Sequence, residues 1–509
     1  MLETEVYVIV QAGGRGSRLR HHTWNKPKCL VSVFGKPILY HLFESFPGSK
    51  FLIIGDYLFN QLKTYLELNP PSVDYRLLRT SDKGTSAGIA NALDLVPAGQ
   101  PVVVTWSDLI ISRLPPWPDK QKLVVCTTST FTCRWTVSEE EILQECAGSN
   151  RGVIGLFFLP DKRCVLRPPD QGEFVKWLAG CGQIFIALEC NDVQELGDFS
   201  ALENANDREG FSRFFNRIEI GEDVVTKTVI DPNYSEVHEN EVRWYDEVSR
   251  LGFRRVPKIH SKSPLVMERI RGKHAFQYHD LTDRERGALL ANYLDSLISL
   301  HDLGSSESKS DEIVEVYLNK TLARLQSVAK IIPGFGDATV TVNGRKCFNP
   351  FAHEGNDFLQ SLIPRLIPDK FVPIHGDPTF SNTIVDDKLR IWFIDPRGSF
   401  CRPGIFGDAW YDFAKVYYSV VGGYDFFNRR KFKLHVDRET VEVLMEEPAF
   451  SKVGRPMFKE YFGDDLSRIQ VIHALIWLSL TGYVKDDVDS VLGAFYQGLY
   501  WLEEGGSRV

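Results

Sequence analysis

Residues 11–19 read Gln11-Ala-Gly-Gly-Arg-Gly-Ser-Arg-Leu19 and follow the apolar run of residues 6–10. Glycines let backbone N–H groups approach phosphate oxygens closely, so a strand that opens into a glycine-dense turn is suited to binding a polyphosphate. Lys28 follows Arg18 at a short distance along the chain, and both cations are of the kind that neutralises phosphate charge. The stretch therefore predicts a nucleotide site in the N-terminal part of the chain.

The composition is that of a globular protein with more than one domain. The chain has 509 residues, of which 43% are hydrophobic and 25% are charged, and one core rarely organises so long a chain. A formal net charge of -8 argues against a general nucleic-acid binder. No apolar run approaches the ~18 residues of a membrane-spanning helix. We expect neither nucleic acid nor membrane among the partners.

Two further features indicate a reducing compartment. The first residues carry neither a basic region nor an apolar run of signal-peptide length, so we expect a cytoplasmic protein. The nine cysteines lie between Cys29 and Cys401 without any Cys-x-x-Cys pair. This pattern predicts free, buried thiols with a structural role.

The first part of the chain has the alternation of an α/β fold. Short apolar runs alternate with amphipathic segments, which predicts a mostly parallel, doubly wound (Rossmann-like) sheet flanked by helices. Ligands of such sheets bind at the carboxyl ends of the strands. The expected strands are residues 6–10, 50–54, 75–78, 102–105, 123–127, 153–159 and 183–188. The expected helices are residues 37–46, 58–66 and 85–95.

A polar segment, residues 198–213, marks the predicted domain boundary. It divides the chain into a first domain, residues 1–210, and a second, residues 211–509. At the start of the second domain, the sequence predicts two paired strands and then a charged helix. The strands are expected at residues 214–219 and 224–229, the helix at 235–250, and loops in a mainly helical remainder at 304–311 and 333–349.

Several motifs of the first domain occur together. They are Gly13-Gly-Arg-Gly-Ser-Arg-Leu19, Thr23, Pro27-Lys28-Cys-Leu30, Gly35-Lys-Pro-Ile38, Phe51-Leu-Ile-Ile-Gly-Asp-Tyr57, Lys83-Gly-Thr-Ser-Ala-Gly88 and Trp106-Ser-Asp108. Over most of residues 1–205 they resemble the sugar-phosphate and phosphocholine nucleotidyltransferases. The resemblance implies Mg²⁺-dependent attack of a phosphate monoester on the α-phosphate of an NTP, with release of pyrophosphate. Because the domain is compact, CTP is the first expectation for that NTP and UTP the second.

The resemblance also implies roles for individual residues. Arg18 and Lys28 contact phosphates as catalytic cations, and Asp108 holds Mg²⁺. The second metal carboxylate is expected at Glu195, with Asp198 as the alternative, since a glutamate is an equally hard oxygen ligand. The residues expected to line the nucleotide are Gly13, Gly14, Gly16 and Thr85, the last beside the base. Two departures from the family, Gln11 and Trp106-Ser107, bear on which base is bound.

The second domain carries another set of reactive groups. They lie in Val372-Pro-Ile-His-Gly-Asp-Pro-Thr-Phe-Ser-Asn382 and in Ile391-Trp-Phe-Ile-Asp395. Asp377 can accept a hydroxyl proton, and Asn382 and Asp395 offer an amide oxygen and a carboxylate to Mg²⁺. Phosphoryl transfer from ATP needs one base and ligands of this kind.

These segments resemble the aminoglycoside phosphotransferase and choline kinase family, which implies a protein-kinase-like α+β domain. Lys227 takes the place of the phosphate-binding lysine, with Glu241 as its expected ion-pair partner and Glu239 as the competitor. Met267 and Glu268 take the place of the hinge against the adenine of ATP. The buried aspartate that braces the catalytic loop is expected within Gly407-Asp-Ala-Trp-Tyr-Asp412.

The C-terminal segment is rich in aromatic residues, which permits two interpretations. Aromatic faces can cage a quaternary ammonium such as choline, but their helical spacing favours an ordinary core. The residues are Trp410, Tyr411, Trp477, Tyr483, Phe495, Tyr496, Tyr500 and Trp501.

Together the two resemblances imply a bifunctional enzyme. The kinase phosphorylates a small hydroxylated metabolite, a sugar or a choline-like amino-alcohol, with ATP. The nucleotidyltransferase then couples that phosphate to CTP or UTP, as in bacterial routes to capsule and other surface polysaccharides. Two alternatives stay open: a nucleotidyltransferase with a non-catalytic kinase-like binding or regulatory domain, and a scaffold that only binds nucleotides.

Overall fold

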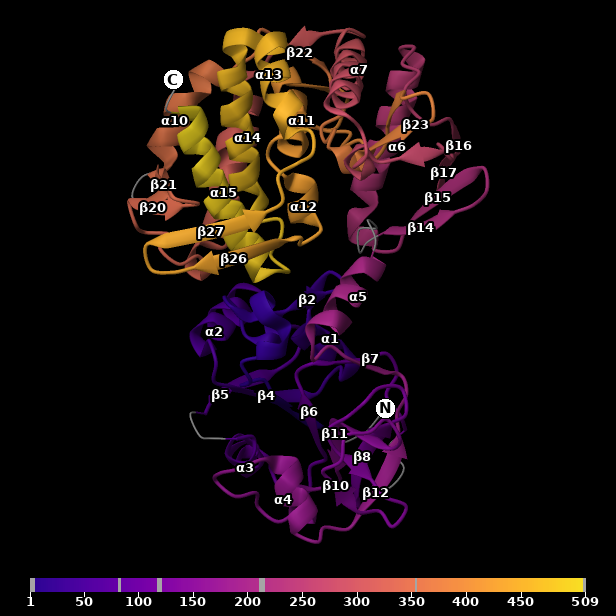
Figure 1. The fold of residues 1–509 in the computed structure, drawn as a ribbon, viewed down its shortest axis with the longest axis vertical. Helices are drawn as coiled ribbons and strands as arrows, with labels where there is room; N and C mark the ends of the chain where they lie inside the picture. The colour runs from indigo at the N-terminus through magenta and orange to yellow at the C-terminus, as the bar shows by residue number, and fades with distance from the viewer. Residues whose placement is uncertain (1–4, 81–83, 117–120, 210–215, 353–354, 507–509) are drawn as a thin grey trace. The chain divides into compact units, whose positions relative to one another are not determined.

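The computed structural model describes residues 5–80, 84–116, 121–209, 216–352 and 355–506. The chain divides into two compact units (Figure 1). The first comprises Met1–Arg208 with Asp486–Asp489, and the second Glu209–Lys485 with Ser490–Val509. The predicted boundary between residues 210 and 211 lies outside the described residues. Nothing in the sequence pattern indicated that a segment as late as residue 486 groups with the first unit.

The first unit is built on a nine-stranded sheet in the order β10-β9-β11-β6-β1-β4-β5, in which β8 pairs with β11 and β12 pairs with β8. At its centre, β1 (Tyr7–Gln11) is parallel to β4 (Lys50–Gly55) and to β6 (Val102–Trp106). The remaining strands are β5 (Tyr75–Arg79), β8 (Leu123–Thr128), β9 (Thr136–Val137), β10 (Leu143–Gln144), β11 (Gly152–Leu159) and β12 (Phe185–Glu189). All seven expected strands are present. However, β11 is antiparallel to β6 and β8, so the sheet is mixed.

Apolar side chains bury both faces of this sheet. On one face, Ile89 and Leu93 of α3 and Phe174 of α4 pack with strand residues such as Ile9 and Val104. A smaller cluster contains Leu19, Val31, Ile38 and Leu202. Burial on both faces explains why the central strands read as continuous apolar runs. The helices are α1 (Ile38–Ser45), α2 (Phe59–Leu68), α3 (Ser86–Leu95) and α4 (Phe174–Gly180), the first three close to their expected positions.

The polar segment of residues 198–213 is largely helical. Helix α5 (Phe199–Glu209) occupies most of it, which its polar composition did not indicate. Leu202 and Ala205 are fully buried, and their spacing of three places them on one helix face, which the polar residues between them concealed. Before α5, β7 (Leu109–Ile111) pairs antiparallel with β13 (Val193–Glu195), and β2 (Ser32–Val33) pairs with β3 (Lys36–Pro37).

The second unit begins with a four-stranded sheet in the order β14-β15-β17-β16. Its strands are β14 (Asn216–Ile220), β15 (Val224–Val229), β16 (Ile259–Lys262) and β17 (Leu265–Glu268). The predicted pair of strands is present as β14 and β15, although residues 214–215 of the first lie outside the described residues. Helix α6 (Ser235–Arg250) has the predicted bounds.

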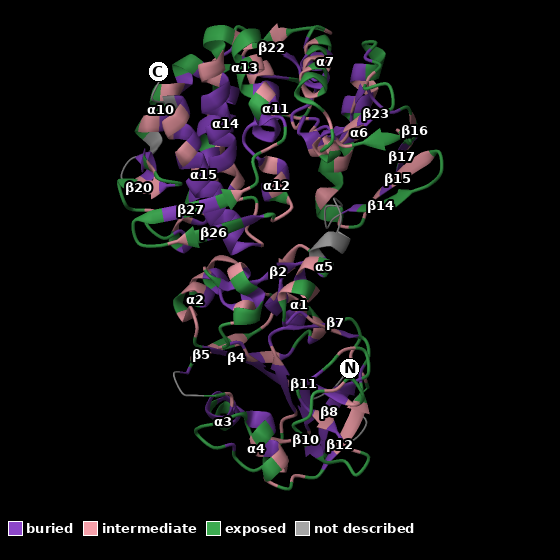
Figure 2. Ribbon diagram, in the orientation of Figure 1, coloured by how far each residue is buried: buried purple, intermediate pink, exposed green. Residues whose placement is uncertain are grey.

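The remainder of the second unit is mainly helical, as predicted. Figure 2 shows α14 as a largely buried helix, and every residue from Ile469 to Leu478 is buried. The helices are α7 (Asp283–His301), α8 (Ser310–Ile313), α9 (Lys320–Gln326), α10 (Gly355–Leu366), α11 (Ala409–Val420), α12 (Tyr424–Asn428), α13 (Ser451–Phe462), α14 (Leu466–Leu480) and α15 (Val488–Gly506). Two three-stranded sheets join β18 (Gly272–Lys273), β23 (Thr383–Asp386) and β24 (Ile391–Phe393), and β19 (Ser306–Glu307), β22 (Lys370–Pro373) and β25 (Phe406–Gly407).

One sheet lies where the sequence analysis expected a loop and helices. Its order is β21-β20-β27-β26, from β20 (Thr339–Val342), β21 (Arg345–Phe348), β26 (Phe432–Val436) and β27 (Thr440–Met445). The predicted loop at residues 333–349 is therefore partly wrong. Asn343-Gly344 between β20 and β21 takes φ values of 48° and 77°, and an Asn-Gly pair directly after a run of β-branched residues is a strong hairpin signal.

The cysteine and aromatic predictions hold in part. All nine cysteines are free, but Cys146 is exposed and Cys164, Cys181 and Cys401 are only half-buried. Among the C-terminal aromatic residues, Trp477, Phe495 and Tyr496 are at most 2% exposed and belong to the core, whereas Tyr483 is 57% exposed. Among the described residues, none of the helices combines the length and the apolar character needed to cross a membrane.

Gly155 gives a test of the first unit's core. It lies in β11 at φ 80°, and a Cβ atom there would stand 2.1 Å from Trp106 Cδ1. Gly155→Ala adds backbone strain to this overlap, so we expect the free energy of unfolding to fall by about 2–4 kcal/mol. Gly180→Ala in α4 is the control, because no atom lies within 4 Å of its added Cβ. Equal stability of the two variants in urea unfolding would contradict this packing.

Candidate active sites

The glycine-dense turn of the first unit packs against Lys28. Gly16 has a φ of 66°, and a Cβ atom there would stand 3.0 Å from Lys28 Cβ, so only glycine allows this approach. Lys28 begins a short 3₁₀ turn after Pro27, and its Nζ forms an ion pair with Asp108 Oδ2. Asp108 follows the carboxyl end of β6, where an α/β sheet binds ligands.

Glu195 lies beside this pair. Strand β13 pairs with β7 so that Glu195 faces Leu109, next to Asp108. Arg18 Nη2 lies 3.8 Å from Glu195 Oε1. Burial and the charge of Asp108 raise the pKa of Glu195, while Lys28 and Arg18 act in the opposite direction. The two cations and two carboxylates expected from the sequence therefore come together in one place.

Asp198, the alternative to Glu195, has another contact. Its Oδ1 accepts a hydrogen bond of 3.0 Å from the N–H of Ala201, in the first turn of α5. An aspartate that satisfies a free N–H at a helix start stabilises the helix. The geometry thus gives Asp198 a capping role and leaves Glu195 beside Asp108.

The other expected nucleotide contacts differ in their surroundings. Gly14 is exposed with no atom within 4 Å of an added Cβ, and Gly13 lies against Asp56. Thr85 Oγ1 instead accepts a hydrogen bond of 2.8 Å from the N–H of Phe174 and so holds the start of α4. Gln11 Oε1 is buried and accepts no hydrogen bond within the described part of the chain.

The catalytic loop of the second unit is held by a buried carboxylate. Asp412, fully buried in α11, accepts hydrogen bonds of 2.8 Å from the N–H groups of His375 and Gly376. His375 Nε2 lies 3.0 Å from the carbonyl oxygen of Ile394, and its Nδ1 accepts from the N–H of Asp377 at 3.2 Å. These hydrogen bonds fix the start of the loop that carries Asp377.

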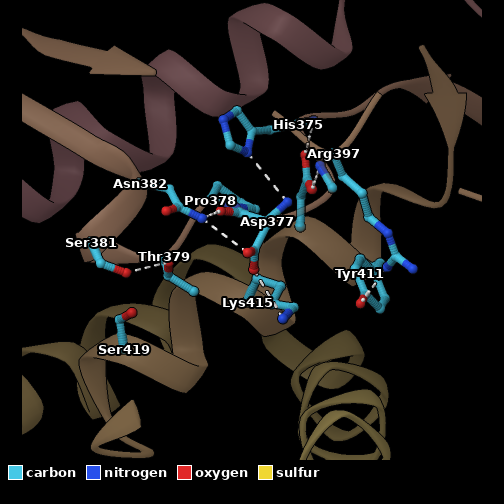
Figure 3. Close-up of polar contacts among 12 residues, drawn as sticks. His375, Asp377, Pro378, Thr379, Ser381, Asn382, Arg397, Tyr411, Lys415 and Ser419 are labelled. Carbon is cyan, nitrogen blue, oxygen red and sulfur yellow. Dashed lines mark hydrogen bonds and ion pairs between the residues drawn. The ribbon is translucent and has the colours of Figure 1, made fainter. Parts of the chain in front are cut away.

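Asp377 lies between an amide and a lysine (Figure 3). Its Oδ2 accepts a hydrogen bond of 2.9 Å from Asn382 Nδ2, and its Oδ1 lies 2.9 Å from Lys415 Nζ. Burial alone would lower the pKa of Lys415, but Asp377 raises it above its usual value. The sequence analysis did not identify Lys415. Its position three residues after Asp412 in one helix, which puts both side chains on the same face, was the available signal.

Lys227 makes two ion pairs at the sheet. Its Nζ lies 2.7 Å from Glu241 Oε2 and 2.8 Å from Asp395 Oδ1, while Glu239 is exposed. Burial would lower the pKa of Lys227, but Asp395 and Glu241 raise it above its usual value. Asp395 has a φ of 53°, which aims its side chain back towards β15 from the loop after β24.

Met267 and Glu268 end strand β17. Met267 is 6% exposed and lies opposite Val225 of β15, whereas Glu268 is exposed and its Oε2 accepts a hydrogen bond from the N–H of Lys258 at 3.2 Å. No contact joins either residue to the catalytic loop within the described ranges. Their role at the adenine stays a prediction.

The oxygen ligands occur in pairs rather than in larger clusters. Across the described residues, no group of three histidine, cysteine or carboxylate side chains is placed to hold a metal ion. In the first unit, Asp108 Oδ1 is buried and accepts no hydrogen bond from a described residue. In the second unit, the amide hydrogens of Asn382 are donated to Asp377, which leaves the amide oxygen to face a ligand. Both pairs suit a hard cation that completes its shell with phosphate oxygens.

Two family models match two separate parts of the chain. Residues 8–113 match the family model of the MobA-like NTP transferase domain, and residues 208–433 match that of the phosphotransferase enzyme family (APH). A comparison with curated proteins finds no match. The chain thus carries an NTP transferase domain followed by an APH-type, kinase-like domain, and it is an enzyme of the transferase class.

Several solved structures are similar to part of the chain. HddC from Yersinia pseudotuberculosis is 19% identical, over 40% of this chain and 98% of its own, with a TM-score of 0.33. The inositol-1-phosphate CTP transferase from T. maritima is 15% identical over 40% and 93%, with a TM-score of 0.32. A CTP:phosphocholine cytidylyltransferase from Streptococcus pneumoniae is 18% identical over 39% and 97%, with a TM-score of 0.31.

Asp408, near Asp412, gives a pH test of the second unit. It is fully buried, accepts a hydrogen bond of 2.7 Å from Tyr317 Oη, and burial raises its pKa to about 6. Its folded-state pKa exceeds its unfolded value, so its contribution is greatest at low pH and is lost as the pH rises through about 6. We expect the second unit to lose about 1 kcal/mol of unfolding free energy from this group between pH 5 and pH 7.

Asp408→Asn should remove this part of the pH dependence, because an amide does not titrate. The single amide oxygen can accept only one of the two hydrogen bonds that Asp408 accepts from Tyr317 Oη and the N–H of Trp410, so the test compares the change with pH and not the absolute stability. Urea unfolding of both proteins at pH 5 and pH 7 measures the difference. Parallel profiles for the two proteins would show that Asp408 does not titrate in this range.

Proposed function

We propose that the protein is a bifunctional enzyme that phosphorylates a small hydroxylated metabolite with ATP and then couples the new phosphate to an NTP. The observation that carries this proposal is the assembly of a reactive set in each unit. Asp377 lies between Asn382 and Lys415 in the second unit, and Lys28 faces Asp108 in the first. We take CTP as the first expectation for that NTP and UTP as the second.

In the first step, a hydroxyl oxygen of the acceptor attacks the γ-phosphorus of ATP, and the bond to the β–γ bridging oxygen breaks. Asp377 accepts the hydroxyl proton, and ADP leaves. Lys227 binds ATP phosphates from β15, and Lys415 compensates charge beside Asp377. Because such transfer depends mainly on position and charge, the fixed catalytic loop favours the reaction.

In the second step, an oxygen of the phosphate monoester attacks the α-phosphorus of the NTP. The bond between the α-phosphorus and the α–β bridging oxygen breaks, and pyrophosphate leaves with its electron pair. Lys28 and Arg18 compensate the charge that develops on the phosphates. The product is an NDP-activated group of the kind used in the synthesis of surface polysaccharides.

Mg²⁺ is the expected cofactor of both units. Asp108 and Glu195 would hold it in the first unit, and Asn382 and Asp395 in the second. When bound, it neutralises phosphate oxygens and orients the phosphates for in-line displacement. After burial, the charge of Asp108 is the next cause that raises the pKa of Glu195, and a cation bound between the two carboxylates would relieve their repulsion.

The two steps can be assigned to the two units by single substitutions. Asp377→Asn removes the base, so we expect ADP formation to fall by about 100-fold or more, while pyrophosphate release from an NTP and a supplied phosphate monoester continues. Lys28→Met should instead lower pyrophosphate release by a similar factor and leave ADP formation unchanged. Asp387→Asn and Lys176→Met, both exposed, are the controls. Loss of ADP formation in Lys28→Met with normal ADP formation in Asp377→Asn would refute the assignment.

The metal site of the first unit can be tested with the two candidate carboxylates. Glu195→Gln removes a charged ligand, so we expect the Mg²⁺ concentration for half-maximal pyrophosphate release to rise by about 10-fold or more. Asp198→Asn should leave this concentration unchanged, because an asparagine caps the start of α5 equally well. If Asp198→Asn alone shifted the Mg²⁺ dependence, Asp198 rather than Glu195 would be the ligand.

A further inference from the structure

Four cations lie near the kinase base Asp377: Lys415 pairs with it, and Arg397, Arg324 and Lys415 are close enough to Lys320 for their charges to act on it. We call Lys320, Arg324, Arg397 and Lys415 the cationic cluster. Arg397 Nη1 lies 3.2 Å from Tyr411 Oη, and Lys415 Nζ lies 5.9 Å from the centre of the Tyr411 ring. Figure 3 shows Arg397 and Tyr411 on one side of Asp377 and Asn382 on the other. Arg397 thus lies on the opposite side of Asp377 from the expected metal ligand Asn382.

Helix α9 supplies the two cations farthest from the base in sequence. Lys320 and Arg324 are one turn apart, so they lie on the same face. Arg324 Nη1 is held by the carbonyl oxygen of Ser479 at 3.1 Å and by its Oγ at 2.9 Å. A π-helical turn, Val314–Asn319, comes directly before Lys320, and such turns are frequent at functional sites.

The cluster lacks the carboxylates that its charge requires. Among the described residues, the side chain of Lys320 makes no hydrogen bond or ion pair, and neither Arg324 nor Arg397 forms an ion pair with a carboxylate; the only carboxylate that pairs with Lys415 is that of Asp377. Burial, together with the charges of the three other cations, lowers the pKa of Lys320 to about 7. Like charges one helix turn apart are destabilising, so a bound anion would relieve this repulsion.

We propose that the acceptor of the kinase unit carries an anionic group, a phosphate or a carboxylate, in addition to the hydroxyl that is phosphorylated. Lys320, Arg324 and Arg397 bind that group and direct the hydroxyl to Asp377. Both anions suit guanidinium and ammonium donors. This inference rests on the proposed function and narrows its substrate class, because a choline-like cation would be repelled from the cluster.

A competing explanation is that the cluster only neutralises ATP. The placement of its members argues against this. Lys227, which we assign to the ATP phosphates, lies on sheet strand β15, with Glu241 and Asp395 as partners. Lys320 and Arg324 instead lie on α9 of the helical part, where Arg324 is tied to the end of α14. Two members of the cluster therefore lie on a different element from Lys227, and the cluster offers more positive charge than the γ-phosphate alone requires.

Anion binding can be measured without knowing the acceptor. The full chain is saturated with Mg²⁺ and a non-hydrolysable ATP analogue, and its thermal midpoint is followed as inorganic phosphate replaces chloride at constant ionic strength. We expect phosphate to raise the midpoint of the wild-type protein and of Lys330→Met, an exposed control, by more than that of Lys320→Met. Arg397→Gln is the second variant should Lys320→Met not fold. Equal protection of all variants, or protection of none, overturns the proposal.

Turnover shows whether the anionic group of the acceptor is a phosphate or a carboxylate. ADP formation is compared for glucose and glucose 6-phosphate, and for glycerol and glycerate. We expect one anionic compound to exceed its neutral partner by about 10-fold or more in kcat/KM, and Lys320→Met to abolish this preference without changing the KM for ATP. A preference for choline or for the neutral compounds overturns the proposal. Absence of ADP formation with every acceptor counts against the kinase function itself, while phosphate binding still decides the anion site.

Discussion

In each unit, a largely buried lysine forms ion pairs with carboxylates. Burying a charge is unfavourable unless it is paired, and this constraint holds the reactive groups in place. Lys28 pairs with Asp108, and Lys227, whose side chain is 10% exposed, pairs with Glu241 and Asp395. These carboxylates are also expected metal ligands or their neighbours. In the proposed reaction, each lysine would gain a phosphate as an anionic partner while its carboxylate would bind Mg²⁺.

The cationic cluster contrasts with these pairs. Lys28, Lys227 and Lys415 each have a carboxylate partner in the described structure, whereas Lys320, Arg324 and Arg397 do not. A lysine paired with a carboxylate is electrostatically stable before its substrate binds. Half-buried cations without a carboxylate partner carry an unfavourable electrostatic energy, which other interactions of the fold must offset. We infer that the lysines paired with carboxylates serve the transfer of phosphate in both units, whereas the cations without such partners recognise the acceptor of the kinase unit.

The sequence predicted those features that depend on short stretches of chain. The strand and glycine turn of residues 6–19, the loop from His375 to Asn382 and the bounds of α6 all follow from local patterns. Glu241, which the kinase-family resemblance implied as the partner of Lys227, lies on α6 and pairs with it. The antiparallel direction of β11 did not follow, because a buried apolar run has the same appearance in either direction. The Asn343-Gly344 hairpin was predictable and was missed.

The cationic cluster shows why sequence alone could not define the acceptor. Its members come from α9, from the loop after β24 and from α11, and only the tertiary fold brings these segments together. The net charge of -8 argued against a general nucleic-acid binder and gave no sign of such a cluster. Yet net charge acts over long distances that salt screens, whereas partly buried cations act at close range with little screening. An acidic protein can therefore select an anionic substrate, provided that the selecting charges are local and lack acidic partners of their own.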